Sequence, residues 1–72
     1  MRAVVDASGR RWQVILGKES WGTLVLLFSP MDGGDVRTSV LTAETMKSAS
    51  AELDSMSDDE LLVRLLESRP WT

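Results

Sequence analysis

The chain has 72 residues, a formal net charge of -3, and neither cysteine nor histidine. This length predicts a single domain, residues 1–72, and so small a domain buries only about 60% of the surface that its unfolded chain exposes. The lack of cysteine excludes disulfides and thiolate metal sites, and the lack of histidine removes the commonest metal ligand and general base. We therefore expect no enzymatic activity, no cofactor and no metal ion. Oligomerisation is then the remaining way to stabilise so short a chain, unless its core alone suffices.

The charge is unevenly distributed along the chain. Residues 1–21 hold four basic and two acidic side chains, whereas residues 42–72 hold three basic and seven acidic ones. An acidic second half disfavours nucleic-acid binding by the whole surface, because such binding depends on neutralising phosphates with Lys and Arg. There is no signal-peptide pattern, and the longest apolar run is far shorter than the about 20 residues that cross a bilayer. We expect a small cytoplasmic protein of bacterial type with no membrane partner.

Residues 1–41 are predicted to be rich in β-strand. Four short strands are expected, over residues 3–6, 11–16, 23–28 and 36–41. The first two flank a tight turn at 7–10, in which Gly9 can adopt a positive φ. Residues 17–22, which include Trp21, are predicted to form a polar loop.

The third strand, Thr23–Phe28, is the most informative segment because it is almost entirely apolar. A strand with one dry and one wet face alternates apolar and polar residues, so this pattern predicts that both faces are buried. Two short helices can cover only one face of a small sheet. The other face must be covered by a strong bend of the sheet or by a second chain, and the sequence leaves both solutions open.

Residues 42–72 are predicted to be α-helical. The first helix is expected to begin at a cap on Thr42 and to end near Asp54, with a narrow face of small apolar residues. The second is expected to begin at Ser57, because Ser57 and Glu60 have the spacing of a capping box. In that motif each side chain accepts a hydrogen bond from the backbone N–H of the other residue.

The order of these elements indicates an α+β domain. We expect a strongly bent antiparallel sheet of four or five strands, followed by two C-terminal helices. A small partial barrel of the SH3-like or Sm-like kind is the alternative. Glycines near the strand ends suit either arrangement, since they allow bends and bulges.

The uncovered face of the third strand leads to the functional hypothesis. We expect a protein–protein interaction or regulatory module that acts as a homodimer and binds an unidentified protein partner. Tryptophan is enriched at the energetic centres of interfaces, and leaving large apolar side chains exposed would forgo much of the stability of a small domain. The expected interface residues are Ile15, Trp21, Val25, Leu27 and Trp71.

The alternative function is nucleic-acid binding by a small barrel with a basic patch on its N-terminal hairpin. Basic residues near tryptophan can contact phosphates and stack on bases. The candidate residues are Arg10, Arg11, Lys18 and Arg37. A polar hairpin in which Trp12 packs inward explains the same pattern more simply, so this function ranks second.

Two acidic segments are better explained by local structure than by metal binding. Asp32 and Asp35 flank two glycines but lack the further oxygen ligands of a calcium loop, so they predict a turn. Asp58 and Asp59 fall in the first turn of the expected second helix, where negative charge is favourable.

Overall fold

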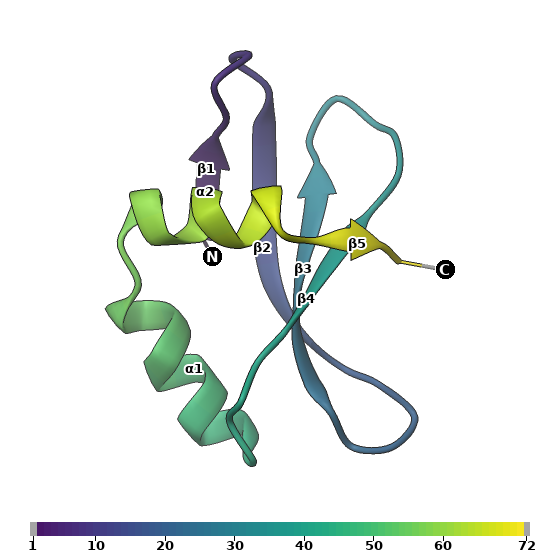
Figure 1. Ribbon diagram of the computed structural model, residues 1–72, viewed down its shortest axis with the longest axis vertical. Coiled ribbons are helices and arrows are strands. Elements are labelled where there is room, and N and C mark those ends of the chain that lie inside the picture. The colour runs from purple at the N-terminus through teal and green to yellow at the C-terminus, as the bar shows by residue number, and fades with distance from the viewer. Residues whose placement is uncertain (1, 72) are drawn as a thin grey trace.

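The computed structural model describes residues 2–71, which form a five-stranded antiparallel sheet and two helices (Figure 1). The strands are β1 (Arg2–Val5), β2 (Arg11–Lys18), β3 (Leu24–Pro30), β4 (Arg37–Val40) and β5 (Arg69–Pro70). The helices α1 (Met46–Ser55) and α2 (Asp58–Leu66) lie between β4 and β5 in the chain. The strands are arranged in sequence order, so each strand pairs with the one that precedes it.

The expected α+β class with an antiparallel sheet is confirmed. β1 and β5 lie at opposite edges of the sheet, which stays open, so it does not close into a barrel. Figure 1 shows strongly twisted strands, with α2 crossing in front of the sheet and α1 beside its lower half. Both helices contribute to one core on the same side of the sheet. The opposite side, which we call the helix-free face, has no helix on it.

The core lies between the sheet and the two helices. It consists of Val4, Trp12, Val14, Leu24, Leu26, Phe28, Leu41, Ala49, Leu53, Met56, Leu61 and Leu65. The strand residues in this set alternate along β2 and β3, because successive side chains of a strand point to opposite faces. Trp12 therefore packs inward, as the sequence predicts.

β3 is buried on both faces, as its apolar sequence predicts. Its residues Leu24, Leu26 and Phe28 belong to the core under the helices. Val25 and Leu27 point to the helix-free face, yet they are only 1% and 8% exposed. Gly17 lies opposite Val25, and a Cβ added to Gly17 would lie 2.8 Å from Leu27 Cδ1. The Leu27 side chain therefore lies over Gly17, in space that a larger residue at position 17 would need.

Asp6 shapes the turn between β1 and β2. Its backbone N–H donates to the carbonyl oxygen of Arg10 at 2.9 Å, and the Gly9 N–H donates to the Asp6 carbonyl at 3.0 Å. Gly9 has a φ of 87°, which favours glycine. The Asp6 carboxylate also accepts hydrogen bonds from the backbone N–H groups of Ser8 and Arg10. The predicted tight turn is confirmed, and it brings Asp6 next to Trp12.

The first helix begins later than the sequence predicts. Its N-cap is Thr45 rather than Thr42, and Thr45 Oγ1 accepts a hydrogen bond from the Ser48 backbone N–H at 3.1 Å. Leu41 is still bound to the sheet through its backbone N–H, which donates to the Leu24 carbonyl at 2.9 Å. The intervening residues carry the chain away from the sheet, so Thr42 cannot start the helix.

The second helix begins where the sequence predicts. Ser57 Oγ accepts from the Glu60 N–H at 3.1 Å, and Glu60 Oε1 accepts from the Ser57 N–H at 3.2 Å. Asp58 and Asp59 occupy the first turn, beside the positive end of the helix dipole. The capping box therefore forms as expected.

The chain returns to the sheet after α2 as β5, within a segment that the sequence indicates to be helical. Arg37 on β4 holds this return, because its Nε donates to Ser68 Oγ at 2.8 Å and its Nη2 donates to the Ser68 carbonyl at 2.6 Å. The Trp71 backbone N–H then donates to the Val36 carbonyl at 2.9 Å. β5 adds the fifth strand to the sheet.

Candidate functional site

Four of the five expected interface residues lie on the helix-free face. On this face the strand register places Ile15 opposite Leu27, and Leu27 opposite Thr38. Thr38 also lies opposite Arg69 of β5, which places Arg69 on this face. Trp71 lies on the same face, because it is two residues after Arg69 and alternate residues of an extended chain share a face. The four residues are Ile15, Val25, Leu27 and Trp71.

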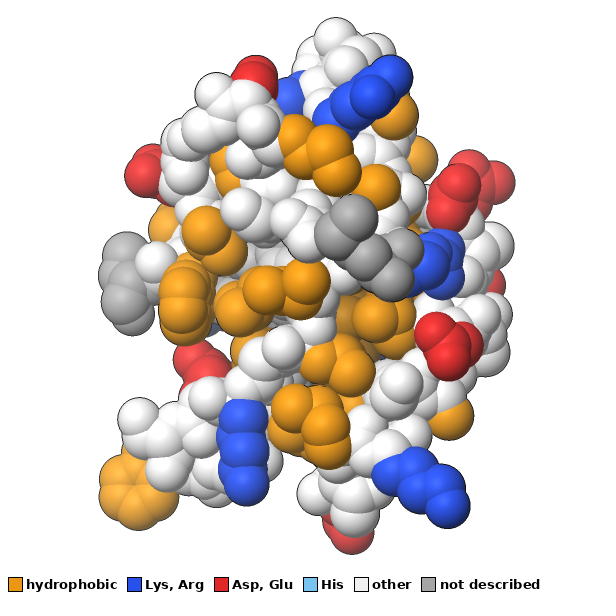
Figure 2. All heavy atoms as spheres, turned by 180° about the vertical axis from the view of Figure 1, so that it is seen from behind, with side chains coloured by type: hydrophobic (Ala, Val, Ile, Leu, Met, Phe, Trp, Pro, Cys, Tyr) orange, Lys and Arg blue, Asp and Glu red, His pale blue; other side chains and the backbone are white. Residues whose placement is uncertain are grey.

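The helix-free face carries exposed apolar side chains. Ile15, Val40 and Trp71 are 42%, 57% and 51% exposed. Figure 2 views the molecule from behind and shows hydrophobic side chains gathered across the middle of this side. Val25 and Leu27 lie buried at its centre within a single chain, which is one of the two arrangements that the sequence leaves open. A partner would contact the three exposed residues directly.

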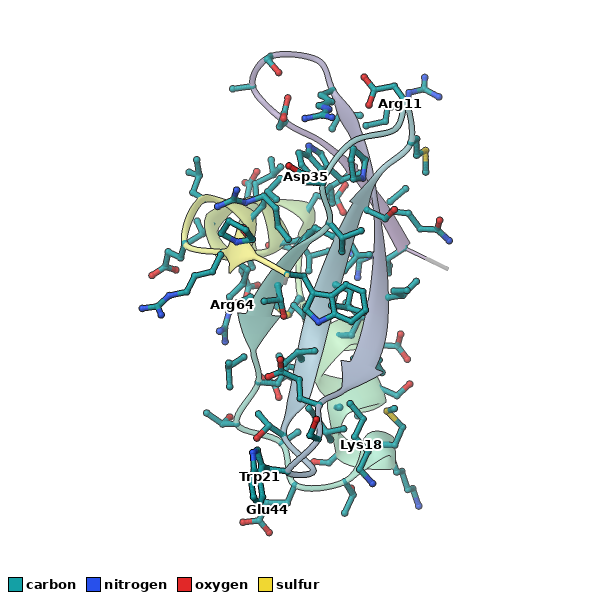
Figure 3. All side chains as sticks on the ribbon, turned by 90° about the vertical axis from the view of Figure 1, so that its right-hand side faces the viewer. Arg11, Lys18, Trp21, Asp35, Glu44 and Arg64 are labelled. Atoms are coloured by element: carbon teal, nitrogen blue, oxygen red, sulfur yellow. The ribbon has the colours of Figure 1, made fainter. Side chains whose placement is uncertain are left out.

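Trp21 lies apart from the other expected interface residues. It is in the turn between β2 and β3, at the lower end of the view in Figure 3, and it is 95% exposed. A hollow of about 410 Å³ lies next to this turn. It is lined by Glu19 and Ser20 of the turn, by Lys18 at the end of β2 and by Trp71. The exposed indole of Trp21 is therefore next to a hollow that Trp71 also lines.

The four basic residues of the alternative function do not form one patch. Arg10 and Arg37 are bound to other parts of the chain, Arg10 through an ion pair with Asp32 at 3.1 Å. Arg11 and Lys18 lie at opposite ends of β2 (Figure 3), roughly 23 Å apart at the usual rise of a strand. Nucleic-acid binding stays a prediction that this arrangement does not favour.

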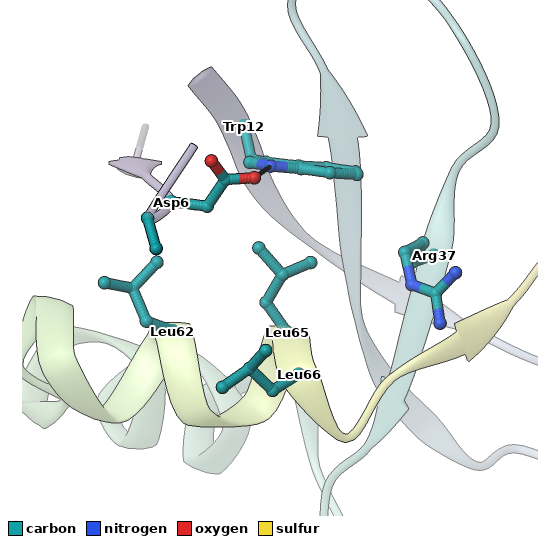
Figure 4. A pocket seen from close by; sticks show the side chains of 7 residues that line it. Asp6, Trp12, Arg37, Leu62, Leu65 and Leu66 are labelled. Carbon is teal, nitrogen blue, oxygen red and sulfur yellow. Dashed lines mark hydrogen bonds between the residues drawn. The ribbon is translucent and has the colours of Figure 1, made fainter. Parts of the chain in front are cut away.

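A second candidate site is an apolar cavity of about 460 Å³ between α2 and the β1–β2 hairpin (Figure 4). It is lined by Asp6, Ala7, Trp12, Arg37, Leu62, Leu65 and Leu66. Its volume falls within the about 300–1,000 Å³ that is usual for small-molecule sites. Trp12 is almost completely buried, whereas Leu66 is 85% exposed. The cavity is thus walled by the core on one side and open to solvent beside α2.

The two charged residues of the cavity, Asp6 and Arg37, differ in how many of their polar atoms already have hydrogen-bond partners. Asp6 Oδ1 accepts from Ser8 Oγ at 2.6 Å, and Asp6 Oδ2 accepts from Trp12 Nε1 at 2.9 Å. These hydrogen bonds, that of Ser8 foremost, lower the pKa of Asp6 from 3.8 to about 2. Within residues 2–71, the Arg37 guanidinium donates to Ser68 and takes part in none of the ion pairs. It therefore brings to the cavity a positive charge that no carboxylate of the described residues pairs with.

Val40 and the cavity are site components that the sequence does not predict. Val40 lies opposite Val25, so it could have been found by pairing the fourth strand with the third. The sequence of α2 holds one indication of the cavity. The helix has more leucines than the core covers, since Leu66 stays exposed. The charged residues of the cavity come from distant segments, and no spacing in the sequence connects them.

Comparison with known proteins assigns no family: no protein-family model, no curated protein and no solved structure matches the chain. Within residues 2–71, no group of three or more acidic side chains is arranged to hold a metal ion. Neither described helix is long and apolar enough to cross a membrane. The geometry of the helix-free face and of the cavity is therefore the basis for a functional proposal.

Proposed function

We propose that this protein is an interaction module that forms a homodimer through its helix-free face. The observation that carries the proposal is the exposed apolar surface formed by Ile15, Val40 and Trp71 on a side of the sheet without a helix. Fully burying a Val or Ile side chain is worth about 1.5–3 kcal/mol, and each of these side chains, being about half exposed, has roughly half of that to gain. Such gains are substantial for a small domain, whose total stability is about 5–15 kcal/mol.

The outline of the molecule limits the size of an interface on this side. Figure 2 views the molecule along its shortest axis, and the two longer dimensions are 33 and 27 Å. A rectangle of these dimensions has an area of about 890 Å², comparable to the about 800 Å² that each partner contributes to a standard interface. An interface of standard size would therefore use nearly the whole of this side of the molecule.

The turn between β2 and β3 supports a second copy of the chain as that partner. A two-fold dimer brings the same patch of both chains together, so the patch must complement itself. The hollow beside Trp71 is lined by one basic and one acidic residue, Lys18 and Glu19. In a two-fold pair, Lys18 of one copy can face Glu19 of the other, and the exposed Trp21 can enter the opposite hollow.

The proposal is tested by placing a charge on each side of the molecule in turn. Val40→Lys introduces a lysine on the helix-free face, and Val63→Lys is the matched control on α2, because the two valines are 57% and 53% exposed. Sedimentation velocity over a range of micromolar concentrations should give twice the 8.0 kDa mass of one chain for the wild type and Val63→Lys. Val40→Lys should sediment as a monomer with an unchanged circular dichroism spectrum.

Two outcomes would overturn the homodimer. A wild-type protein that stays monomeric at every concentration has no self-association to explain. Dissociation by Val63→Lys but not by Val40→Lys would move the interface to the helices. Trp21→Ser adds a test of the turn, since it should weaken the dimer without affecting the core.

A further inference from the structure

We propose that the cavity between Trp12 and α2 binds a small amphipathic monocarboxylate. Its acid group would meet Arg37, and its apolar body would lie against Leu65 and Leu66. The cavity is on the side of the sheet that carries the helices, whereas the proposed dimer uses the other side. The two proposals can therefore succeed or fail independently.

The lining of the cavity determines the apolar part of the ligand. Leu62, Leu65 and Leu66 supply aliphatic surface from α2, and Trp12 supplies an aromatic wall whose indole N–H is already bound to Asp6. Figure 4 shows the leucine side chains on one side and the indole on the other. No polar group of Trp12 is left for a ligand, so an apolar chain or ring fits between these walls.

Arg37 determines the charge of the ligand. Its Nη1 group donates to no residue within 2–71, and no carboxylate of that segment pairs with it. A half-buried guanidinium of this kind matches the geometry of a carboxylate, which accepts two parallel N–H groups. One guanidinium balances one negative charge, which favours a monoanion over a phosphate.

Asp6 determines the orientation of the ligand. Its carboxylate is ionised at neutral pH and its oxygens are already engaged by neighbouring donors. In Figure 4, Asp6 and Arg37 lie on opposite sides of Leu65. A ligand carboxylate is therefore repelled at one end of the cavity and attracted at the other.

The test compares an acid with the neutral alcohol of the same length. Decanoate and 1-decanol are titrated below their aggregation limits into ¹⁵N-labelled protein, and the indole signal of Trp12 is followed by NMR. We expect decanoate to shift this signal and to bind more tightly than decanol. Arg37→Gln should reduce the affinity for decanoate about tenfold and leave that for decanol unchanged, since a hydrogen bond to a charged group is lost only with the acid.

Two further variants separate the site from general effects. Leu66→Ser should weaken both ligands, and it should not disturb folding because this side chain is already 85% exposed. Arg69→Gln removes an exposed arginine that does not line the cavity and should change neither affinity. The affinities for decanoate and decanol are compared within each variant. A small loss of stability in Arg37→Gln affects both affinities and therefore does not alter the conclusion.

Three results would overturn the proposal. The first is that neither ligand shifts the Trp12 indole signal. The second is that Arg37→Gln leaves the ratio of acid to alcohol affinity unchanged. The third is tighter binding of a leucine-rich peptide with a free C-terminal carboxylate, which would assign the cavity to a protein segment instead of a small molecule.

Discussion

Asp6 connects the turn between β1 and β2 to the core through a single carboxylate. Its oxygens accept hydrogen bonds from the backbone and hydroxyl of Ser8, from the backbone of Arg10 and from the indole of Trp12. Trp12 is 5% exposed, and a buried indole N–H without an acceptor is costly. The residue thus serves the turn, the core and one wall of the cavity together.

Asp6→Asn should lower stability at neutral pH and flatten its pH dependence in acid. The pKa of Asp6 is lowered from 3.8 to about 2 in the folded protein, so the carboxylate stabilises the fold above about pH 4. This contribution is lost as the pH falls towards 2. Urea unfolding of wild type and variant from acidic to neutral pH measures the difference. Asp54→Asn is the control for losing one negative charge, and an unchanged pH profile in Asp6→Asn would contradict the assignment.

At the scale of the elements, local signals place the second helix better than the first. Ser57 and Glu60 satisfy each other's backbone N–H groups, and this motif lies within four residues. Thr42 and Thr45 are both possible caps by type, and only the position of Leu41 in the sheet decides between them. A cap can therefore be predicted from the sequence when its partners are local, and not when the sheet constrains the chain before it.

Ser57→Ala should lower the free energy of unfolding by about 1 kcal/mol, because it removes the acceptor for the Glu60 N–H and breaks the capping box. Urea denaturation monitored by circular dichroism gives this value. Ser50→Ala is the matched control, since Ser50 is exposed on α1 and is not a cap, and its effect should stay within about 0.5 kcal/mol. Equal effects of the two substitutions would rule out a stabilising role of the cap.

At the scale of the whole molecule, Arg2 ties the first strand to the junction of the two helices. Its Nη1 donates to the carbonyl oxygens of Leu53 and Met56, both at 3.0 Å, and its Nη2 pairs with Asp58 at 2.9 Å. The carbonyl groups are at the C-terminal end of α1, where a positive charge is favourable. One side chain therefore joins segments more than 50 residues apart in the sequence.

Arg2→Gln should destabilise the protein by about 1.5–3 kcal/mol, because the two carbonyl groups lose a charged donor. Asp58→Asn should cost much less, since the Asp58 side chain is 73% exposed and exposed ion pairs contribute about 0–1 kcal/mol. Lys47→Gln on α1 controls for the loss of a positive charge. Urea unfolding measures the stability of all three variants. A larger effect of Asp58→Asn than of Arg2→Gln would show that the ion pair matters more than the carbonyl contacts.

The proposed functions also belong to this scale, because each uses surface that several elements build together. The helix-free face combines residues of β2, β4 and the segment after β5, and the cavity combines the turn between β1 and β2 with residues of β2, β4 and α2. The sheet separates the two sites. A ligand in the cavity and a second copy on the opposite face can therefore be bound together without steric conflict.

The sequence by itself determined the order of four strands and two helices, the turn at residues 7–10, the cap at Ser57 and the burial of both faces of β3. Each of these depends on residues close together in the chain. Only the tertiary structure decided that Val25 and Leu27 on the second face of β3 are buried within one chain, because this depends on the strand register and on the packing of segments far apart in the sequence. It also decided that Asp6, Trp12 and Arg37 share a cavity with α2, since sheet twist and packing bring together groups that no local pattern connects.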